Sequence, residues 1–269
     1  MDFTYTTYKR FISPFLNQQY SFQTFVDFIQ KSLIKTIMLR HDVDKLPKNS
    51  LLTARLENEI GIKGSYYFRA VPESWDERII KEISALGHEI GYHYENLSKM
   101  SEARGVRSEA QLFELAFDDF EKNLEKLRAI APVSTICMHG SPLSKWDSRD
   151  LWKKYDYKTL GIIGEPYFDV DFSKVFYLTD TGRRWDGFKV SRRDRIPQYQ
   201  DQWEKEGLVF HSTQDIIDAA NQGRLPNQMM ITVHPQRWTD KTWPWLRELI
   251  WQNSKNIVKR YVVRKGKFL

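Results

Sequence analysis

Short apolar runs alternate along the chain with longer segments whose apolar positions recur at helical spacing. The short runs are typical of buried strands and cover residues 35–40, 65–71, 88–94, 133–138, 159–163, 174–178, 207–210 and 228–233. The helical segments, several of which begin at a Ser and end at a Gly, cover residues 21–33, 50–61, 74–87, 108–130, 148–155, 212–223 and 241–258. Strands that alternate with helices predict a parallel sheet covered by helices.

About six to eight such units in 269 residues favour a closed or nearly closed β/α barrel over an open sheet. No repeat, low-complexity tract or linker interrupts the chain, so we expect a single domain over residues 1–269. Residues 1–34 are expected to form an N-terminal helical extension. Residues 164–206 are rich in Asp, Arg, Trp and Tyr and show little periodicity, which predicts long loops near the site or a small antiparallel insertion.

The composition, 41% hydrophobic and 28% charged, is typical of a soluble globular protein. No apolar run approaches the roughly eighteen residues that cross a membrane, and the first residues lack the apolar centre of a secretory signal. We therefore expect a cytoplasmic protein with no transmembrane segment. The single cysteine, Cys137, excludes an intramolecular disulfide framework and a zinc ribbon.

The net charge of +6 is compatible with an anionic small molecule, a membrane surface or nucleic acid. We expect no nucleic-acid partner, because acidic residues dilute the basic ones and no recognised binding module is present. The basic run within residues 183–195 could neutralise a diphosphate or could be a solvated loop. The aromatic and basic segment from Trp243 to Lys259 fits a membrane-surface helix, and it fits a packed barrel helix equally well.

Aromatic residues make up 14% of the chain and could either fill the core or stack on sugar rings. Those at helical positions are expected to pack internally: Phe22, Phe25, Phe113, Phe117 and Phe120. Those at strand ends or in nearby loops form a candidate carbohydrate platform: Tyr92, Tyr94, Trp146, Tyr167, Trp185 and Trp238.

Polar residues follow several of the predicted strands at the point where each strand ends. These segments are HDVD at 41–44, YHYE at 92–95, MHGSP at 138–142 and HPQ at 234–236. In a β/α barrel the carboxyl ends of the strands meet on one face, and the chemistry gathers there. The convergence of four histidines on that face is the strongest functional signal in the sequence.

In HDVD, the period of two places Asp42 and Asp44 on one face of the strand and His41 on the other. Two carboxylates this close repel each other unless one is protonated or a cation lies beside them. A divalent cation would take one carboxylate as a ligand and leave the other to act as a base. The alternative is an Asp-rich turn that caps the next helix.

His93 and Glu95 share a strand face and could ligate zinc or a similar cation, although a surface ion pair would also explain them. His139 and His234 could each be satisfied by a backbone carbonyl or belong to a turn. Taken together on one barrel face, these residues predict a hydrolytic site built around a metal.

At these motifs the chain resembles the polysaccharide deacetylases, the NodB-like superfamily that includes carbohydrate esterase family 4, in order over residues 35–237. HDVD looks like the family's Asp pair with one residue between. The resemblance implies Asp42 as general base, Asp44 and His93 as metal ligands, and His234 in VHP as general acid. It also implies a distorted (β/α)7 TIM-like barrel, and zinc or another divalent metal such as nickel or cobalt.

The chain departs from the family pattern at three places. Leu97 stands where the family has its second histidine, and Glu95 and His139 are the candidate substitutes for that ligand. HGSP replaces the family's Arg-Pro segment, so the arginine that orients the base has no direct counterpart. The candidate stand-ins for this arginine are Arg40, Arg183 and Arg184. The segment TDTGRRWDG (179–187) lies where the family has a substrate-lining Asp and Trp.

The sequence thus predicts a hydrolase that removes an acetyl group from an N-acetylated or O-acetylated sugar. We expect the sugar to be a nucleotide-linked or lipid-linked precursor in surface-polysaccharide biosynthesis. The candidate substrate-binding residues are His41, Tyr94, Ser141, Arg184 and Trp185. Two alternatives stay open: a catalytically silent glycan-binding or scaffold protein, favoured by Leu97, and a metal-dependent amidase acting on a non-sugar substrate.

Overall fold

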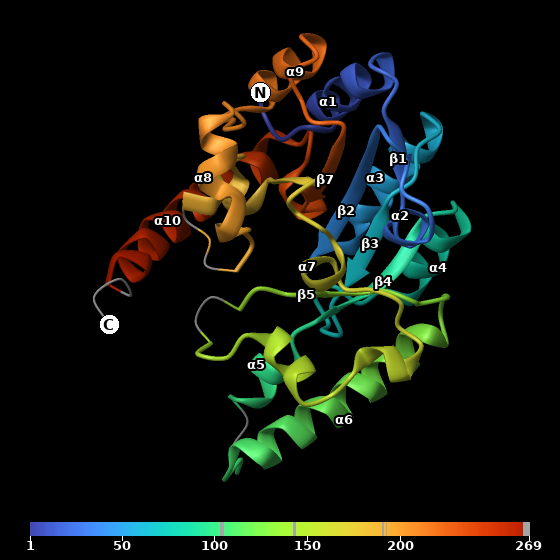
Figure 1. The fold of residues 1–269 in the computed structure, drawn as a ribbon, viewed down its shortest axis with the longest axis vertical. Coiled ribbons are helices and arrows are strands. Elements are labelled where there is room, and N and C mark those ends of the chain that lie inside the picture. Colours follow the sequence, from blue (N-terminus) through green and yellow to red (C-terminus); the bar gives the residue numbers. More distant parts are fainter. Residues whose placement is uncertain (103–104, 142–143, 190, 192, 266–269) are drawn as a thin grey trace.

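The computed structural model describes residues 1–102, 105–141, 144–189, 191 and 193–265, with side chains up to residue 257 in the last helix. Its centre is a parallel sheet in the order β5-β4-β3-β2-β7-β6, with β1 paired to β2 outside this path (Figure 1). The strands are β1 (Ser21–Gln23), β2 (Thr36–Val43), β3 (Ser65–Phe68), β4 (Glu89–Tyr94), β5 (Ile136–Met138), β6 (Phe176–Thr179) and β7 (Gln228–Val233). The last strand, β7, returns beside the central β2, which curls the sheet.

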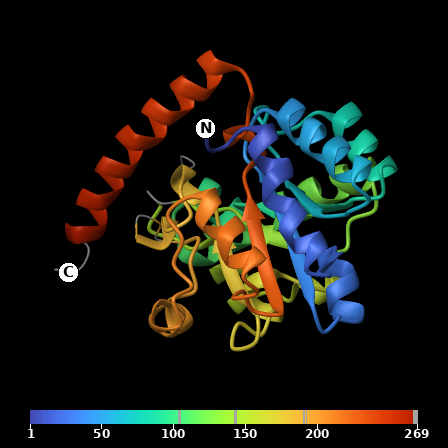
Figure 2. The same cartoon turned by 90° about the horizontal axis from the view of Figure 1, so that it is seen from above.

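Helices surround the sheet (Figures 1 and 2). The α-helices are α1 (Tyr5–Asn17), α2 (Phe25–Gln30), α3 (Pro47–Glu59), α4 (Glu77–Ala85), α5 (Asn96–Met100), α6 (Glu109–Arg128), α7 (Pro166–Asp169), α8 (Pro197–Lys205), α9 (Thr213–Asn221) and α10 (Thr242–Lys265). The 3₁₀ helices are η1 (Ser148–Lys153), η2 (Tyr157–Leu160), η3 (Thr181–Arg183), η4 (Gly187–Lys189) and η5 (Pro235–Arg237). The predicted α/β fold with a parallel sheet is confirmed.

Local sequence signals set the element boundaries close to where they were expected. Asp76 caps α4 and Ser108 caps α6, while Ser212 and Asp215 form a reciprocal capping box at α9. Each of these side chains accepts a hydrogen bond from a backbone N–H that would otherwise lack a partner at the helix start. All eight residues of β2 are buried, as expected for a central strand covered on both faces.

Three expectations about the elements are wrong, at residues 21–33, 159–163 and 207–210. Residues 21–33 form a short strand and then α2, because Ser21–Gln23 pairs with Thr36–Met38. Residues 159–163 and 207–210 form no strand: the first run begins within η2, which ends at Leu160, and the second run carries no sheet pairing. Within the described part of 164–206, β6 runs parallel to β7, so that strand does not build an antiparallel insertion.

Two buried clusters flank the sheet. One gathers α1, α9 and the apolar residues of β2, β6 and β7; the other gathers α4, α6 and residues of β3, β4 and β5. Gly91 in β4 is required for this packing, because a Cβ there would lie 2.3 Å from the ring of Tyr67. Among the described residues, no helix has both the length and the apolar character needed to cross a membrane.

Candidate metal centre and active site

The carboxyl ends of β2, β4, β5 and β7 deliver the predicted polar residues to one place. Asp42 lies in β2, with Asp44 two residues further on, and His93 lies in β4. His139 and His234 directly follow β5 and β7. Because every pairing in this sheet is parallel, these ends meet at one edge, as the sequence pattern predicted.

Asp44, His93 and His139 come together as a group that could hold a metal ion. The Oδ1 atom of Asp44 lies 3.6 Å from Nε2 of His93 and 3.4 Å from Nε2 of His139. Four ligands about 2.1 Å from a tetrahedral zinc ion stand about 3.4 Å apart, so these separations match the edges of such a site. His139 is thus the candidate for the third ligand position, which Leu97 cannot fill.

Both imidazole rings are oriented by contacts on their far side. Nδ1 of His93 donates to the carbonyl of Cys137 at 2.9 Å, which leaves the Nε2 lone pair of a neutral ring facing Asp44. Nδ1 of His139 lies 2.9 Å from Oε2 of Glu95. Partners of this kind fix the ring orientation of metal-binding histidines.

Glu95 was predicted as a metal ligand, and the structure assigns it a different place. Its carboxylate accepts hydrogen bonds from Arg69 at 2.7 to 3.0 Å and contacts the outer nitrogen of His139. Burial opposes ionisation of Glu95, but the contacts with His139 and Arg69 lower its pKa to about 2. Glu95 thus orients a ligand, and the prediction that it binds the metal directly is not supported.

The buried charges at the centre suit a cation. Oδ1 of Asp44 is buried and has no hydrogen-bond partner, whereas Oδ2 accepts from Gln236 at 3.0 Å. Burial lowers the pKa of His93, yet Asp42 and Asp44 raise it above its ordinary value. An oxygen without a partner that faces two imidazole nitrogens is what a divalent cation would complete, so the residues fit the predicted metal.

A second possible group combines Asp42, His93 and Cys137. Both groups use Nε2 of His93, so a metal ion can be bound at only one of them at a time through that nitrogen. Burial raises the pKa of the Cys137 thiol well above its ordinary value. Because the thiolate is the metal-binding form, the group with Asp44 and His139 is the better site.

Asp42 is held by Arg40, one of the three arginines expected to replace the family's base-orienting residue. Nε and Nη2 of Arg40 donate to the two carboxylate oxygens of Asp42 at 2.8 and 2.6 Å. Burial would raise the pKa of Asp42, but Arg40, followed by His93 and His234, lowers it. The carboxylate of Asp42 therefore stays ionised, with Oδ2 3.7 Å from Nε2 of His93.

His234 is backed by a residue that the sequence reasoning missed. Its Nδ1 lies 2.6 Å from Oδ1 of Asp180, a fully buried carboxylate that also accepts from Arg237 and Trp238 at 2.8 Å. The Nε2 atom of His234 then faces the site, 4.0 Å from Oδ2 of Asp44. The signal was present in TDTG at 179–182, directly after a predicted strand, but it suggested only a substrate-lining role.

Three predicted substrate-binding residues are wrong because their side chains are buried elsewhere. His41 points to the opposite side of β2, where its ring stacks on Tyr66 and contacts Glu57 at 2.8 Å. Tyr94 is fully buried against Phe120 and Trp152. Trp185 is 3% exposed and packs among the aromatic residues of the core.

The structure places the other residues singled out in the sequence, Arg184, Ser141 and Leu97, in different surroundings. Arg184 pairs with Asp186 at 2.5 to 2.7 Å and is part-buried, with no contact to the metal centre recorded among the described residues. Ser141 lies two residues after His139, and its carbonyl accepts from Ser144 at 3.2 Å. Leu97 is fully buried in the core that includes β4 and α6.

Most of the candidate aromatic platform is also core. Tyr92 and Trp238 are each 1% exposed, like the buried Tyr94 and Trp185, whereas Tyr167 and Trp146 keep partial exposure. The expected packing of Phe25, Phe113 and Phe120 is confirmed.

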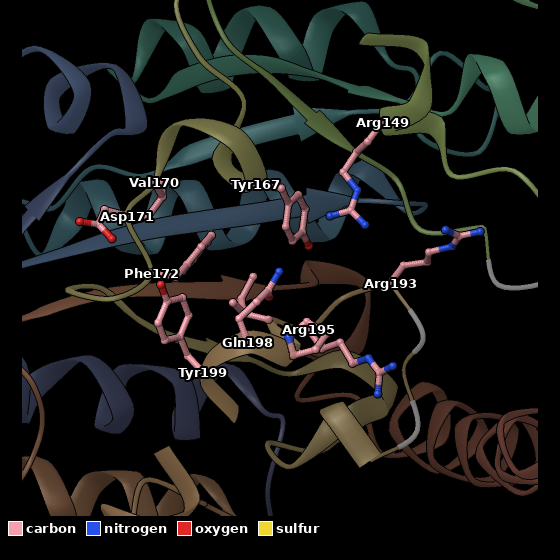
Figure 3. Close-up of a pocket in the computed structure, with 11 residues that line it drawn as sticks. Arg149, Tyr167, Val170, Asp171, Phe172, Arg193, Arg195, Gln198 and Tyr199 are labelled. Atoms are coloured by element: carbon pink, nitrogen blue, oxygen red, sulfur yellow. The ribbon is translucent and has the colours of Figure 1, made fainter. Parts of the chain in front are cut away.

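Tyr167 lines a pocket of about 380 Å³ beside the site (Figure 3). Arg149, Arg193 and Arg195 also line it, and Asp147 pairs with the first two at 2.7 and 2.6 Å. Two contacts connect the lining of this pocket to neighbours of the metal centre, Arg40 and Gly140. The guanidinium of Arg40 lies 5.4 Å from the Tyr167 ring, and a Cβ at position 140, next to His139, would lie 3.1 Å from Cβ of Arg193.

Some basic residues of the run at 183–195 line the pocket, and others pair with residues elsewhere. Arg193 and Arg195 line the pocket, whereas Lys189 lies 3.6 Å from Asp186, the same partner that holds Arg184. Arg183 stacks on Trp245. Arg192 lies outside the described residues.

No protein-family model and no curated protein matches the chain. Among solved structures, the chain is similar to a wild-type CE4 family pseudoenzyme from Bacillus anthracis, with 11% identity and a TM-score of 0.43 over 82% of this chain and 61% of that one. A mutant of that pseudoenzyme with restored enzymatic activity gives 12% identity and a TM-score of 0.41, over 82% and 63%.

A truncated 3-deoxy-D-arabino-heptulosonate 7-phosphate synthase from Thermotoga maritima gives 12% identity and a TM-score of 0.26, over 86% of this chain and 88% of that one. The chain thus spans less than two thirds of the CE4 family structures. At these identities and TM-scores, the similarities say nothing about activity, which rests on the geometry of the site.

Proposed function

We propose that this protein is a metal-dependent hydrolase that removes an acetyl group from an N-acetylated sugar. The observation that carries the proposal is the combination of three groups at one edge of the sheet. These are a cation site at Asp44, His93 and His139, an ionised Asp42 held by Arg40, and His234 backed by Asp180. This combination supplies a metal, a base and an acid around one point.

Each group has a defined task in amide hydrolysis. A bound divalent cation, zinc in our proposal, supplies Lewis acidity, which acidifies water and polarises a carbonyl group. Asp42 accepts the proton of the attacking water, and Arg40 keeps its carboxylate ionised and correctly placed. His234 carries a proton on Nε2 toward the leaving amine, because Asp180 holds the opposite nitrogen of the ring.

The pocket beside the metal centre supports a sugar that carries an anionic group. Of its three arginines, Arg149 and Arg193 both pair with Asp147, and the buried Nε of Arg195 has no hydrogen-bond partner among the described residues. Guanidinium groups bind phosphate and carboxylate oxygens in pairs, and the ring of Tyr167 offers a face for a sugar. A nucleotide-linked or lipid-linked acetamido sugar has both features.

Acetate release from UDP-N-acetyl sugars and from lipid-linked N-acetyl sugars tests the proposal. With zinc, nickel or cobalt added, we expect Asp42→Asn to keep its metal and lose at least about 100-fold in turnover, whereas Asp44→Asn should lose both metal and turnover. Asp118→Asn, at an exposed position on α6, is the matched control and should match the wild type.

Equal metal content and activity in the two site variants would contradict the assigned roles. Metal binding without acetate release from any acetylated sugar would instead favour a silent glycan-binding protein or an amidase for another substrate. His139, whose Nε2 lies 3.4 Å from Oδ1 of Asp44, is our proposed third ligand, so Leu97 alone does not argue against metal binding.

A further inference from the structure

The last helix, α10, exposes a row of large apolar side chains. Trp243, Leu246, Ile250 and Ile257 are 72%, 38%, 60% and 58% exposed, and Trp251 beside them is 57% exposed. Spacings of three, four and seven residues bring the first four onto one face of the helix. The helix extends along the outside of the molecule (Figure 2).

The face of α10 that contacts the protein carries polar side chains together with the partly buried Trp245 and Leu249. Gln252 and Asn256 are buried, and Nδ2 of Asn256 donates to the carbonyl of Gly182 at 2.9 Å. Nη1 of Arg183 donates to the carbonyl of Trp245 at 2.9 Å. A helix that packs on a core turns its apolar side chains inward, whereas α10 leaves most of its large apolar side chains up to residue 257 exposed.

The positive charge of α10 indicates what kind of partner would bind its exposed apolar face. Its sequence contains six basic residues against one acidic residue, Glu248; the basic residues are Arg247, Lys255, Lys259, Arg260, Arg264 and Lys265. A second copy of the helix would bring two positively charged segments together. An anionic lipid surface would attract them, and indole rings favour the boundary between lipid and water.

We propose that α10 docks the protein on an anionic membrane surface, with its apolar face among the lipid headgroups. Helices with aromatic and aliphatic residues on one side and basic residues around it bind membranes in this way. The charge of +6 on the whole chain acts in the same direction.

Docking through α10 would hold the metal-centre side of the protein near the membrane, with the helix between them. Nζ of Lys45, the residue after Asp44, lies 3.3 Å from Oε2 of Glu248 in α10. The η3 turn that carries the other contacts directly follows Asp180. Resting on the proposed function, this placement favours a lipid-linked sugar over a nucleotide-linked one.

Flotation of the full-length protein with lipid vesicles tests the docking and needs no catalysis. We expect binding to vesicles of phosphatidylcholine mixed with phosphatidylglycerol, weak binding to phosphatidylcholine alone, and a decline as salt is raised. Ile250→Ser/Ile257→Ser should weaken binding by about tenfold or more. Leu52→Ser/Leu115→Ser removes two exposed leucines on α3 and α6 and should bind like the wild type.

Several results would overturn the proposal. These are no binding to the mixed vesicles, equal binding to both vesicle types, and equal losses in the two double variants. Light scattering that shows a dimer lost in Ile250→Ser/Ile257→Ser would assign the face to a second copy of the chain. Binding to vesicles without acetate release from lipid-linked sugars would keep the docking and reject the lipid-linked substrate, whereas absence of release from UDP-N-acetyl sugars as well would reject the proposed function.

Discussion

The contacts of the buried Asp180 carboxylate predict how Asp180→Asn changes the free energy of unfolding. Oδ1 accepts from Nδ1 of His234 at 2.6 Å and Nη1 of Arg237 at 2.8 Å, while Oδ2 accepts from Nε1 of Trp238 at 2.8 Å. In Asp180→Asn, the amide oxygen can keep the first two contacts, so the NH₂ group must face the indole N–H. Two donors then meet in a buried site with no acceptor between them.

Two costs follow for the free energy of unfolding. Removal of the charge leaves Arg237 buried without its carboxylate, which typically costs about 3–5 kcal/mol. The facing donors of the amide and Trp238 add about 1–3 kcal/mol for the unsatisfied groups. The part of the second cost that comes from the indole is absent in Trp238→Phe, which has no N–H, although the backbone N–H of His234, 3.1 Å from both Asp180 oxygens, remains. The double variant should therefore be about 1–3 kcal/mol more stable than the sum of the two single variants predicts.

Urea unfolding of the wild type, both single variants and the double variant measures this coupling. Nitrogen-15 NMR of His234 gives an independent readout, since Asp180 should hold the proton on Nδ1 in the wild type. If the two substitutions add within about 0.5 kcal/mol, Trp238 and Asp180 do not interact as described.

Further predictions concern burial and packing elsewhere. Glu57 is fully buried between histidine and tyrosine side chains, so Glu57→Gln should cost about 3 kcal/mol in urea unfolding, whereas Glu59→Gln, at an exposed ion pair, should cost less than about 1 kcal/mol. Burial raises the pKa of Glu165 from 4.5 to about 7, so its contribution to stability is greatest below pH 4.5. That contribution should fall by up to about 3 kcal/mol as the pH rises through 7. Comparing the unfolding free energy of the wild type with that of Glu165→Gln on both sides of pH 7 checks this. Gly91→Ala should cost about 1–3 kcal/mol through its clash with Tyr67, and an unchanged thermal midpoint would refute this packing.

The parallel sheet and the strand-end residues could be predicted because hydrophobic periodicity is a local signal. The run at 228–233 and the strand that leads to HDVD each carry their own pattern, and the following polar residues mark the active edge. Asp42, Asp44, His93 and His234 were placed together on this basis, and the structure brings them together.

The errors came from residues whose role depends on distant contacts. Trp185 looked like a loop residue near the site, but Phe11 and Trp238, far away in sequence, enclose it. Glu95 has the spacing of a ligand, yet Arg69 from the neighbouring strand end holds it on the outer side of His139. The sequence also could not predict which face of α10 contacts the protein, since periodicity shows that a helix has two faces but not which one packs inward.

The central claim is that His139 completes a metal site with Asp44 and His93, and metal binding tests it most directly. Protein stripped with a chelator and dialysed against zinc should take up one equivalent in the wild type and in His211→Ala, whose side chain is exposed. His139→Ala should lose most of that zinc, because it removes one of the three protein ligands. Full zinc occupancy in His139→Ala, with affinity equal to that of the wild type, would contradict the account.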